Sequence, residues 1–85
     1  MQTISYVIQD KEGIHARPAG ELVKLANRFS ASILIGKDGK NVDCKKIFGI
    51  MGLGVKKGHE VIFIIEGEDE VEAAAAIDSF LRNHL

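Results

Sequence analysis

The sequence predicts an α+β fold, an open-faced β-sandwich with a four-stranded antiparallel sheet and three helices on one face. Apolar residues alternate in several short segments, as in strands with one buried face. In three other segments they recur every three or four residues, as in amphipathic helices. The order along the chain is β-α-β-β-α-β-α, and its 85 residues are enough for one domain, residues 1–85.

The first strand and the first helix are expected over residues 3–8 and 16–29. Alternate side chains of the strand face the core, whereas the helix has its apolar positions three and four residues apart. The inward side chains are Ile4, Tyr6 and Ile8 in the strand, and Ala19, Leu22, Val23, Ala26 and Phe29 in the helix.

A β-hairpin is expected next, because Asp38-Gly39 separates two short alternating segments, residues 32–36 and 40–44. Its inward side chains are Ile33, Ile35, Val42 and Cys44. Cys44 is the single cysteine, so it has no partner for an intramolecular disulfide. Its inward position predicts a core residue rather than a nucleophile.

The second half begins with a short helix over residues 46–53, for which Gly54 is a plausible C-terminal cap. Residues 60–66 are a strand whose unbroken apolar run indicates a central place, with both faces at least partly covered. Asp69 and Glu72 resemble a capping box at the start of the last helix. The inward side chains expected there are Val71, Ala74, Ile77, Phe80 or Leu81, and Leu85.

Composition and charge exclude several classes of function. The net charge of −1 argues against a dedicated nucleic-acid binder, which usually has a basic excess. No apolar run approaches the roughly 20 residues that span a bilayer, and the first residues lack a signal-peptide pattern. A soluble cytoplasmic protein without membrane insertion is expected. Lysines gather in the middle of the chain and acidic residues near its end. The two groups can both belong to solvated faces, or the lysines can form a docking surface for an acidic partner.

The most informative segment is Gly-Ile-His-Ala-Arg-Pro-Ala at residues 13–19, between the first strand and the first helix. Pro18 favours a first helical turn, because the N–H that it lacks would have no helical partner there. His15 is then at or next to the N-cap, where the backbone N–H groups of Ala16 and Arg17 point outward and the helix dipole favours anions. Arg17 adds a guanidinium suited to phosphate oxygens, and a neutral His15 is a candidate nucleophile for phosphoryl transfer.

Other interpretations of these residues remain. A lone histidine near an N-cap is more often an incidental surface residue. No metal is expected, because His15, His59 and His84 are widely separated and lack a ligand spacing. No cofactor is expected either, since the glycines of residues 49–54 match neither a Walker nor a dinucleotide-binding pattern.

Three motifs make the chain resemble the HPr family, the histidine-containing phosphocarriers of the bacterial phosphoenolpyruvate:sugar phosphotransferase system. They are residues 13–19, residues 45–55 and residues 66–70, with Gly58 between the last two. The resemblance extends over essentially the whole chain. It implies that His15 accepts a phosphoryl group on its δ nitrogen from phospho-Enzyme I, with Arg17 nearby, and passes it to EIIA components for sugar uptake. Such a carrier is a substrate of other enzymes and not a stand-alone turnover enzyme.

The resemblance also implies a partner-binding surface, in which Ile47, Phe48 and Met51 form an apolar patch ringed by Lys24, Lys45 and Lys46. The family's regulatory serine is expected at position 46, and the lysine there predicts that the serine switch is missing. A regulatory binding module of the same fold, without transport flux, is the alternative. The presence of both His15 and Arg17 favours the carrier, because a docking module needs no phosphate site.

The face of the sheet opposite the helices is unusually apolar. Strand parity places Val7, Leu34, Ile62 and Ile64 there, where a water-facing sheet normally has polar residues. Scattered apolar residues on a surface are common, but adjacent ones suggest a partner surface or a weak homodimer.

Overall fold

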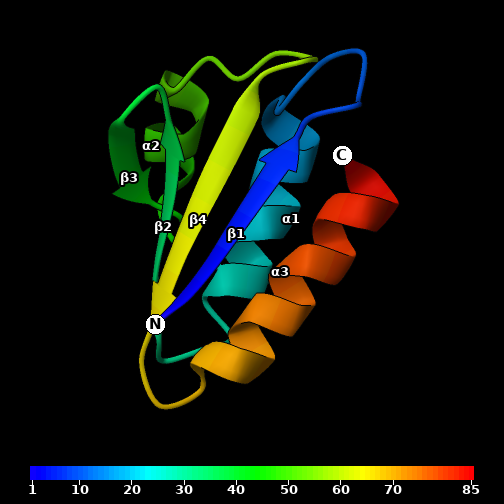
Figure 1. Ribbon diagram of the computed structural model, residues 1–85. Coiled ribbons are helices and arrows are strands. Elements are labelled where there is room, and N and C mark those ends of the chain that lie inside the picture. Colours follow the sequence, from blue (N-terminus) through cyan, green and yellow to red (C-terminus); the bar gives the residue numbers. More distant parts are fainter.

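The computed structural model describes residues 1–85 and has the predicted order and layers (Figure 1). The sheet is antiparallel in the order β1-β4-β2-β3, and α1 and α3 lie side by side against one of its faces, while α2 packs against α1 and β3. The strands are β1 (Gln2–Val7), β2 (Ser32–Lys37), β3 (Lys40–Asp43) and β4 (Glu60–Glu66). The helices are α1 (Ala16–Ala26), α2 (Ile47–Gly52) and α3 (Glu70–His84).

Strand β4 has the central place that its continuous apolar sequence predicts. Phe63 pairs with Ile4 of β1 on one side and with Ile35 of β2 on the other, and its side chain is fully buried. No second layer covers the opposite face, however. Ile62 is 41% exposed there, so the apolar run of β4 reflects a central position and only one covered face.

The hairpin between β2 and β3 confirms the turn signal. Lys37 pairs with Lys40, and both residues between them have positive φ, 53° at Asp38 and 83° at Gly39. Positive φ at both central positions is what a two-residue type I′ turn requires, and its twist matches that of the two strands. Aspartate and glycine are among the residues that adopt this conformation most readily.

The core between the sheet and the helices is entirely apolar. Its fully buried side chains include Leu22 of α1, Ile77 and Leu81 of α3, and Ile33 and Phe63 of the sheet. Cys44 belongs to the same core and is fully buried, as the hairpin parity predicts. Burial raises the pKa of its thiol to about 12, because the thiolate would lose its hydration there.

Two helices differ from the expected pattern. Helix α1 ends at Ala26 rather than at Phe29, because the N–H groups of Arg28 and Phe29 bond three residues back in a tighter turn. In α3, Val71 was expected to face inward but is 61% exposed. The buried position is Ala73, which is four residues before Ile77 and therefore on the same face of the helix.

Helix α3 begins where the predicted capping box places it, but the hydrogen bonds of a capping box are not formed. Asp69 is the N-cap but makes no side-chain bond to its own helix. Its carboxylate instead accepts the N–H groups of Ser30 and Ala31, both at 2.8 Å. Oε1 of Glu70, and not of Glu72, accepts a backbone N–H, that of Gly67 at 3.1 Å. The loops before α3 and before β2 pack together here, since a Cβ on Gly67 would lie 2.7 Å from the Ala31 Cα.

Candidate functional site

His15 is the N-cap of α1, as the position of Pro18 predicts. Its backbone is extended, with φ −92° and ψ −177°, and its carbonyl oxygen accepts the N–H of Ala19 at 3.0 Å. The imidazole makes no capping bond to the helix. Its side chain is 30% exposed, so the ring is partly covered by the protein and partly open to solvent.

The first turn of α1 offers unpaired donors beside the ring. The N–H groups of Ala16 and Arg17 make no hydrogen bond to the preceding loop or to a side chain. The Arg17 side chain is exposed, and none of the ion pairs involves it. No acidic residue lies in this first turn to neutralise the positive end of the helix dipole. Unpaired N–H groups at the positive end of a helix dipole are the kind of arrangement that can bind an anion, and the His15 ring lies at its edge.

The loop that presents His15 is tied to two other parts of the chain. Ile14 donates its N–H to the carbonyl of Val55 at 3.1 Å, and Asp10 donates to the carbonyl of Leu85 at 3.0 Å. Gly13 has φ +67°, and a Cβ there would lie 2.2 Å from the Val55 carbonyl oxygen. Only glycine fits this position, which holds the residue before Ile14 tightly against the turn that precedes β4.

An acidic side chain that the sequence analysis missed lies beside His15. Oε2 of Glu12 is 3.8 Å from Nε2 of the ring. Asp10 lies close by, and polar atoms of Asp10, Glu12 and His15 all fall within 4.8 Å of one another. Oδ1 of Asp10 also accepts the Glu12 N–H at 2.8 Å. The spacing of Glu12 three residues before His15 was the available signal, but the tight turn that folds them together was not predicted.

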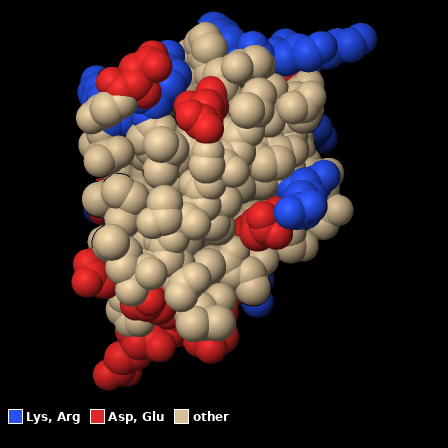
Figure 2. Space-filling model, in the orientation of Figure 1, with Lys and Arg blue, Asp and Glu red and all other residues tan.

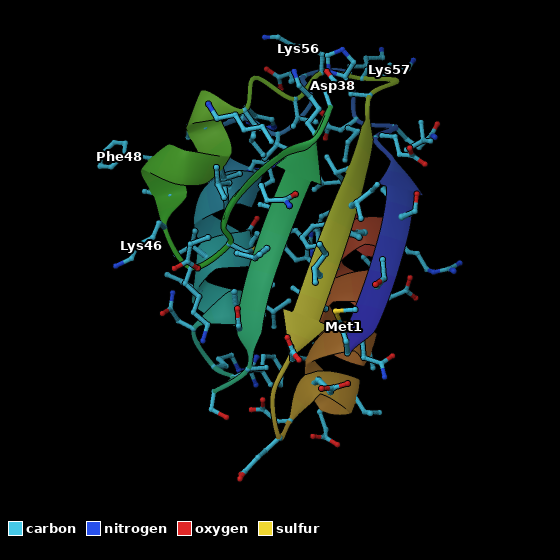
Figure 3. All side chains as sticks on the ribbon, turned by 60° about the vertical axis from the view of Figure 1, so that its left-hand side comes forward. Met1, Asp38, Lys46, Phe48, Lys56 and Lys57 are labelled. Carbon is cyan, nitrogen blue, oxygen red and sulfur yellow. The ribbon has the colours of Figure 1, made fainter.

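The apolar patch on α2 is largely open to solvent. Phe48 is 88% exposed and Met51 is 40% exposed, while Ile47 is half-buried against the core. Figure 3 shows Phe48 and Lys46 pointing away from the body of the molecule on the α2 side. Residues Ile47, Phe48 and Met51 are called the α2 patch below.

The three lysines expected around the α2 patch are not equivalent. Lys24, in the last turn of α1, and Lys46, the N-cap of α2, are both exposed, and neither side chain makes a hydrogen bond. Lys45 is half-buried, and its Nζ donates to the carbonyl oxygen of Phe29 at 2.8 Å. Lys45 therefore helps to close the end of α1, and Lys24 and Lys46 are the free cations near the patch.

Charges are unevenly distributed along the molecule. Figure 2 shows mainly acidic side chains at the lower end, where β4 ends and α3 begins, whereas the upper end has both basic and acidic ones. Lys56 and Lys57 lie at this upper end (Figure 3), next to the turn that binds the His15 loop through Val55. No helix is both long and apolar enough to cross a membrane.

Comparison with known proteins gives a family that covers almost the whole chain. Residues 2–83 match the family described as "PTS HPr component phosphorylation site". The HPr-like protein Crh of Bacillus subtilis is 43% identical over 75 residues, which cover 88% of each chain.

Solved structures agree with this assignment. HPr from Thermoanaerobacter tengcongensis superposes with a TM-score of 0.93 at 42% identity, covering 98% of this chain and 93% of that one. Crh from Bacillus subtilis, solved as a dimer with a swapped domain, gives a TM-score of 0.78 at 40% identity, covering 94% and 92%. The fold, the helix-capping histidine and these matches together show that the chain belongs to the HPr family.

Proposed function

We propose that this chain is a phosphoryl carrier in sugar uptake, which accepts a phosphoryl group on His15 from phospho-Enzyme I and passes it to EIIA-type proteins. The observation that supports this most directly is the position of the His15 ring at the start of α1. The next two residues of the helix, Ala16 and Arg17, have unpaired N–H groups, and the exposed side chain of Arg17 has no ion-pair or hydrogen-bond partner. A docking module would have no use for these donors.

Phosphoryl transfer requires mainly that the protein position the imidazole and the groups that stabilise negative charge on the phosphoryl oxygens. The lone pair of the imidazole Nδ1 attacks phosphorus, and the bond from phosphorus to the donor breaks. In this transfer, charge spreads over three equatorial phosphoryl oxygens, which the N–H groups of Ala16 and Arg17 and the Arg17 side chain can stabilise. Because the ring is only 30% exposed, it approaches a donor from one side, and the donor's own surface completes the exclusion of water.

Partner proteins would dock on the α2 patch. Phe48 is exposed far beyond what a core residue would be, and exposed aromatic side chains are frequent anchors at interfaces. Lys24 and Lys46 add positive charge without internal partners, which suits an acidic surface on Enzyme I and on EIIA proteins. The lysine at position 46 has no hydroxyl, so we also propose that this chain lacks the serine phosphorylation switch.

The carrier function is tested with phosphoenolpyruvate, purified Enzyme I and the intact chain. We expect one acid-labile phosphoryl group per chain, absent from His15→Ala and retained in His84→Ala, which removes a histidine from α3. Absence of label in the unaltered chain, under conditions that charge a known HPr, would contradict the proposal. Incubation of His15→Ala with the serine kinase of the family and ATP should add no phosphate, and phosphoserine in this variant would contradict the missing switch.

A regulatory binding module is the second candidate, and the similarity to Crh favours it. The two functions differ in whether the phosphoryl group taken up by the chain is passed on to support sugar uptake. In a strain whose own HPr is deleted, a carrier restores uptake of sugars that depend on the phosphotransferase system, and His15→Ala does not. A chain that takes up phosphate from Enzyme I but leaves uptake at the level of the deletion strain would be a module without transport flux.

A further inference from the structure

Glu12 is the one carboxylate that lies within ion-pair distance of His15. Its Oε2 lies 3.8 Å from Nε2, the ring nitrogen that the proposed phosphoryl transfer leaves unused. The loop fixes the backbone of Glu12 near the ring, because the Glu12 N–H is bonded to the Asp10 carboxylate and the next N–H, that of Gly13, is bonded to the Asp10 carbonyl at 3.0 Å. The carboxylate thus faces Nε2, whereas the nitrogen that is proposed to react with phosphorus is Nδ1.

We propose that Glu12 is a positioning residue for phosphoryl transfer, whose carboxylate keeps a proton on Nε2 of His15 and leaves the lone pair on Nδ1. This inference rests on the proposed function, because it concerns the step in which His15 is phosphorylated. A neutral imidazole carries its proton on only one nitrogen, and a neighbouring carboxylate favours the nitrogen that faces it.

The distance sets the form of this interaction. At 3.8 Å the two atoms are farther apart than a hydrogen bond allows, so the attraction acts across the gap or through a bridging water. The Glu12 side chain is 75% exposed and free to turn toward the ring when a partner covers it. Covering the pair also removes water, which strengthens the attraction.

The proton balance of the cycle follows from this placement. Before transfer, Nε2 holds the proton and Nδ1 the lone pair. When the Nδ1–P bond forms, the electron pair of the breaking bond leaves with the donor, and the ring becomes cationic with its Nε2 proton still in place. Glu12 offsets that positive charge. When the phosphoryl group moves on, the electron pair of the Nδ1–P bond returns to Nδ1, so His15 neither gains nor loses a proton in either step.

The state of the ring can be observed without any phosphorylation. We would label the histidine rings with ¹⁵N and record both His15 nitrogens by NMR at about pH 9, where an ordinary imidazole is neutral. We expect Nε2 to be the protonated nitrogen in the unaltered chain and the proton to be shared more evenly in Glu12→Gln. Glu68→Gln is the matched control, because it makes the same change at an exposed carboxylate in the loop between β4 and α3. EDTA in all samples removes any cation held by Asp10, Glu12 and His15.

The rate of transfer from phospho-Enzyme I gives the second measurement. A unit charge about 4 Å away, fully screened by water, changes a rate by roughly fivefold, so Glu12→Gln should lower kcat by at least about fivefold once the partner has displaced water from the pair. KM should stay the same, because the α2 patch is unaltered, and Glu68→Gln should match the unaltered chain in both values. Equal tautomer populations in Glu12→Gln and the unaltered chain would overturn the role of Glu12 even if His15 is phosphorylated. Failure of the unaltered chain to accept phosphate would instead overturn the proposed function, and this role with it.

Discussion

Asp69 and Ala31 are 38 residues apart in the sequence, yet Oδ1 of Asp69 accepts the Ala31 backbone N–H at 2.8 Å. The other carboxylate oxygen accepts the N–H of Ser30. Together they join the loop before α3 to the loop before β2. Both loops lie at the end of the molecule away from the start of α1 (Figure 1), so this contact supports the fold without touching the candidate site.

Asp69→Asn is expected to lower the folding stability at neutral pH and to make that stability fall less as the pH is lowered. The N–H of Ser30 is the main reason that the pKa of Asp69 lies below its ordinary value. A lowered native pKa means that the stabilisation is complete above the unfolded pKa, about 4, and is lost as the pH falls through the native value. Melting temperatures between pH 7 and pH 2 measure this. Glu72→Gln is the control, and an acid response of Asp69→Asn equal to that of the unaltered chain would contradict the prediction.

Gly13→Ala is expected to destabilise the protein by more than about 2 kcal/mol, since it combines an unfavourable positive φ with a collision. The added Cβ would meet the Val55 carbonyl and push the loop of His15 away from its support. Gly54→Ala is the matched control, because φ there is +63° and nothing lies within 4 Å of the new atom. Its cost should be about 1 kcal/mol. Urea unfolding measures both, and equal losses would show that the contact at Gly13 is unimportant.

Phe48→Ala is expected to weaken docking without weakening the fold. The side chain is 88% exposed, so its loss costs the free protein little, whereas its burial by a partner would contribute about 2 kcal/mol, or about thirtyfold in affinity. Val71→Ala removes another exposed apolar side chain, on α3, and should leave affinity unchanged. Binding to Enzyme I by calorimetry and melting temperature are the two measurements. Unchanged affinity in Phe48→Ala would remove the α2 patch from the interface.

Lys46→Ser is expected to stabilise the protein by about 1 kcal/mol, because serine is a good N-cap and lysine is not. Lys46 makes no capping bond to α2, and its positive charge lies at the positive end of the helix dipole. Lys57→Ser, in the turn before β4, is the control and should have little effect. Denaturant unfolding distinguishes them. A gain in both variants would point to overall charge rather than to capping.

The open face of the sheet is predicted to associate weakly with a second copy. Val7 and Ile62 are 44% and 41% exposed there, and Leu34 and Ile64 are half-buried beside them. Figure 2 shows a mostly uncharged centre between a mainly acidic lower end and an upper end with both basic and acidic side chains. Two copies with antiparallel strands would place the basic side chains of each upper end near the acidic lower end of the other copy. Sedimentation at rising concentration should show a dimer that Ile62→Lys and high salt dissociate. A monomer throughout would contradict this, and a dimer that survives Ile62→Lys would indicate another arrangement, such as the swapped one described for Crh.

Local patterns predicted the elements well because each was strong. The Asp38-Gly39 turn, the alternation in β1 and the apolar run of β4 each have a local physical cause, and the strand over residues 60–66 was placed correctly at both ends. The N-cap position of His15 followed from Pro18 for the same reason. These features depend on residues only a few positions apart.

Features that depend on tertiary contacts were predicted less well. The Asp69 carboxylate serves a loop 38 residues away, which no local capping rule reveals. Lys45 was grouped with the docking cations, but its Nζ is bonded to the carbonyl of Phe29. Glu12 was missed because its closeness to His15 depends on a turn fixed by Asp10 and Gly13. In each case the partner is set by how segments pack, which periodicity does not encode.

The burial of Cys44 has a practical consequence for measuring stability. A thiol with a pKa of about 12 and no exposed surface does not react with a labelling reagent while the core is closed. Since the chain has one cysteine, every labelling event reports an opening of the structure around residue 44. The rate of labelling under native conditions thus gives the free energy of that opening, and allows the stability of unphosphorylated and phosphorylated chains to be compared without denaturant.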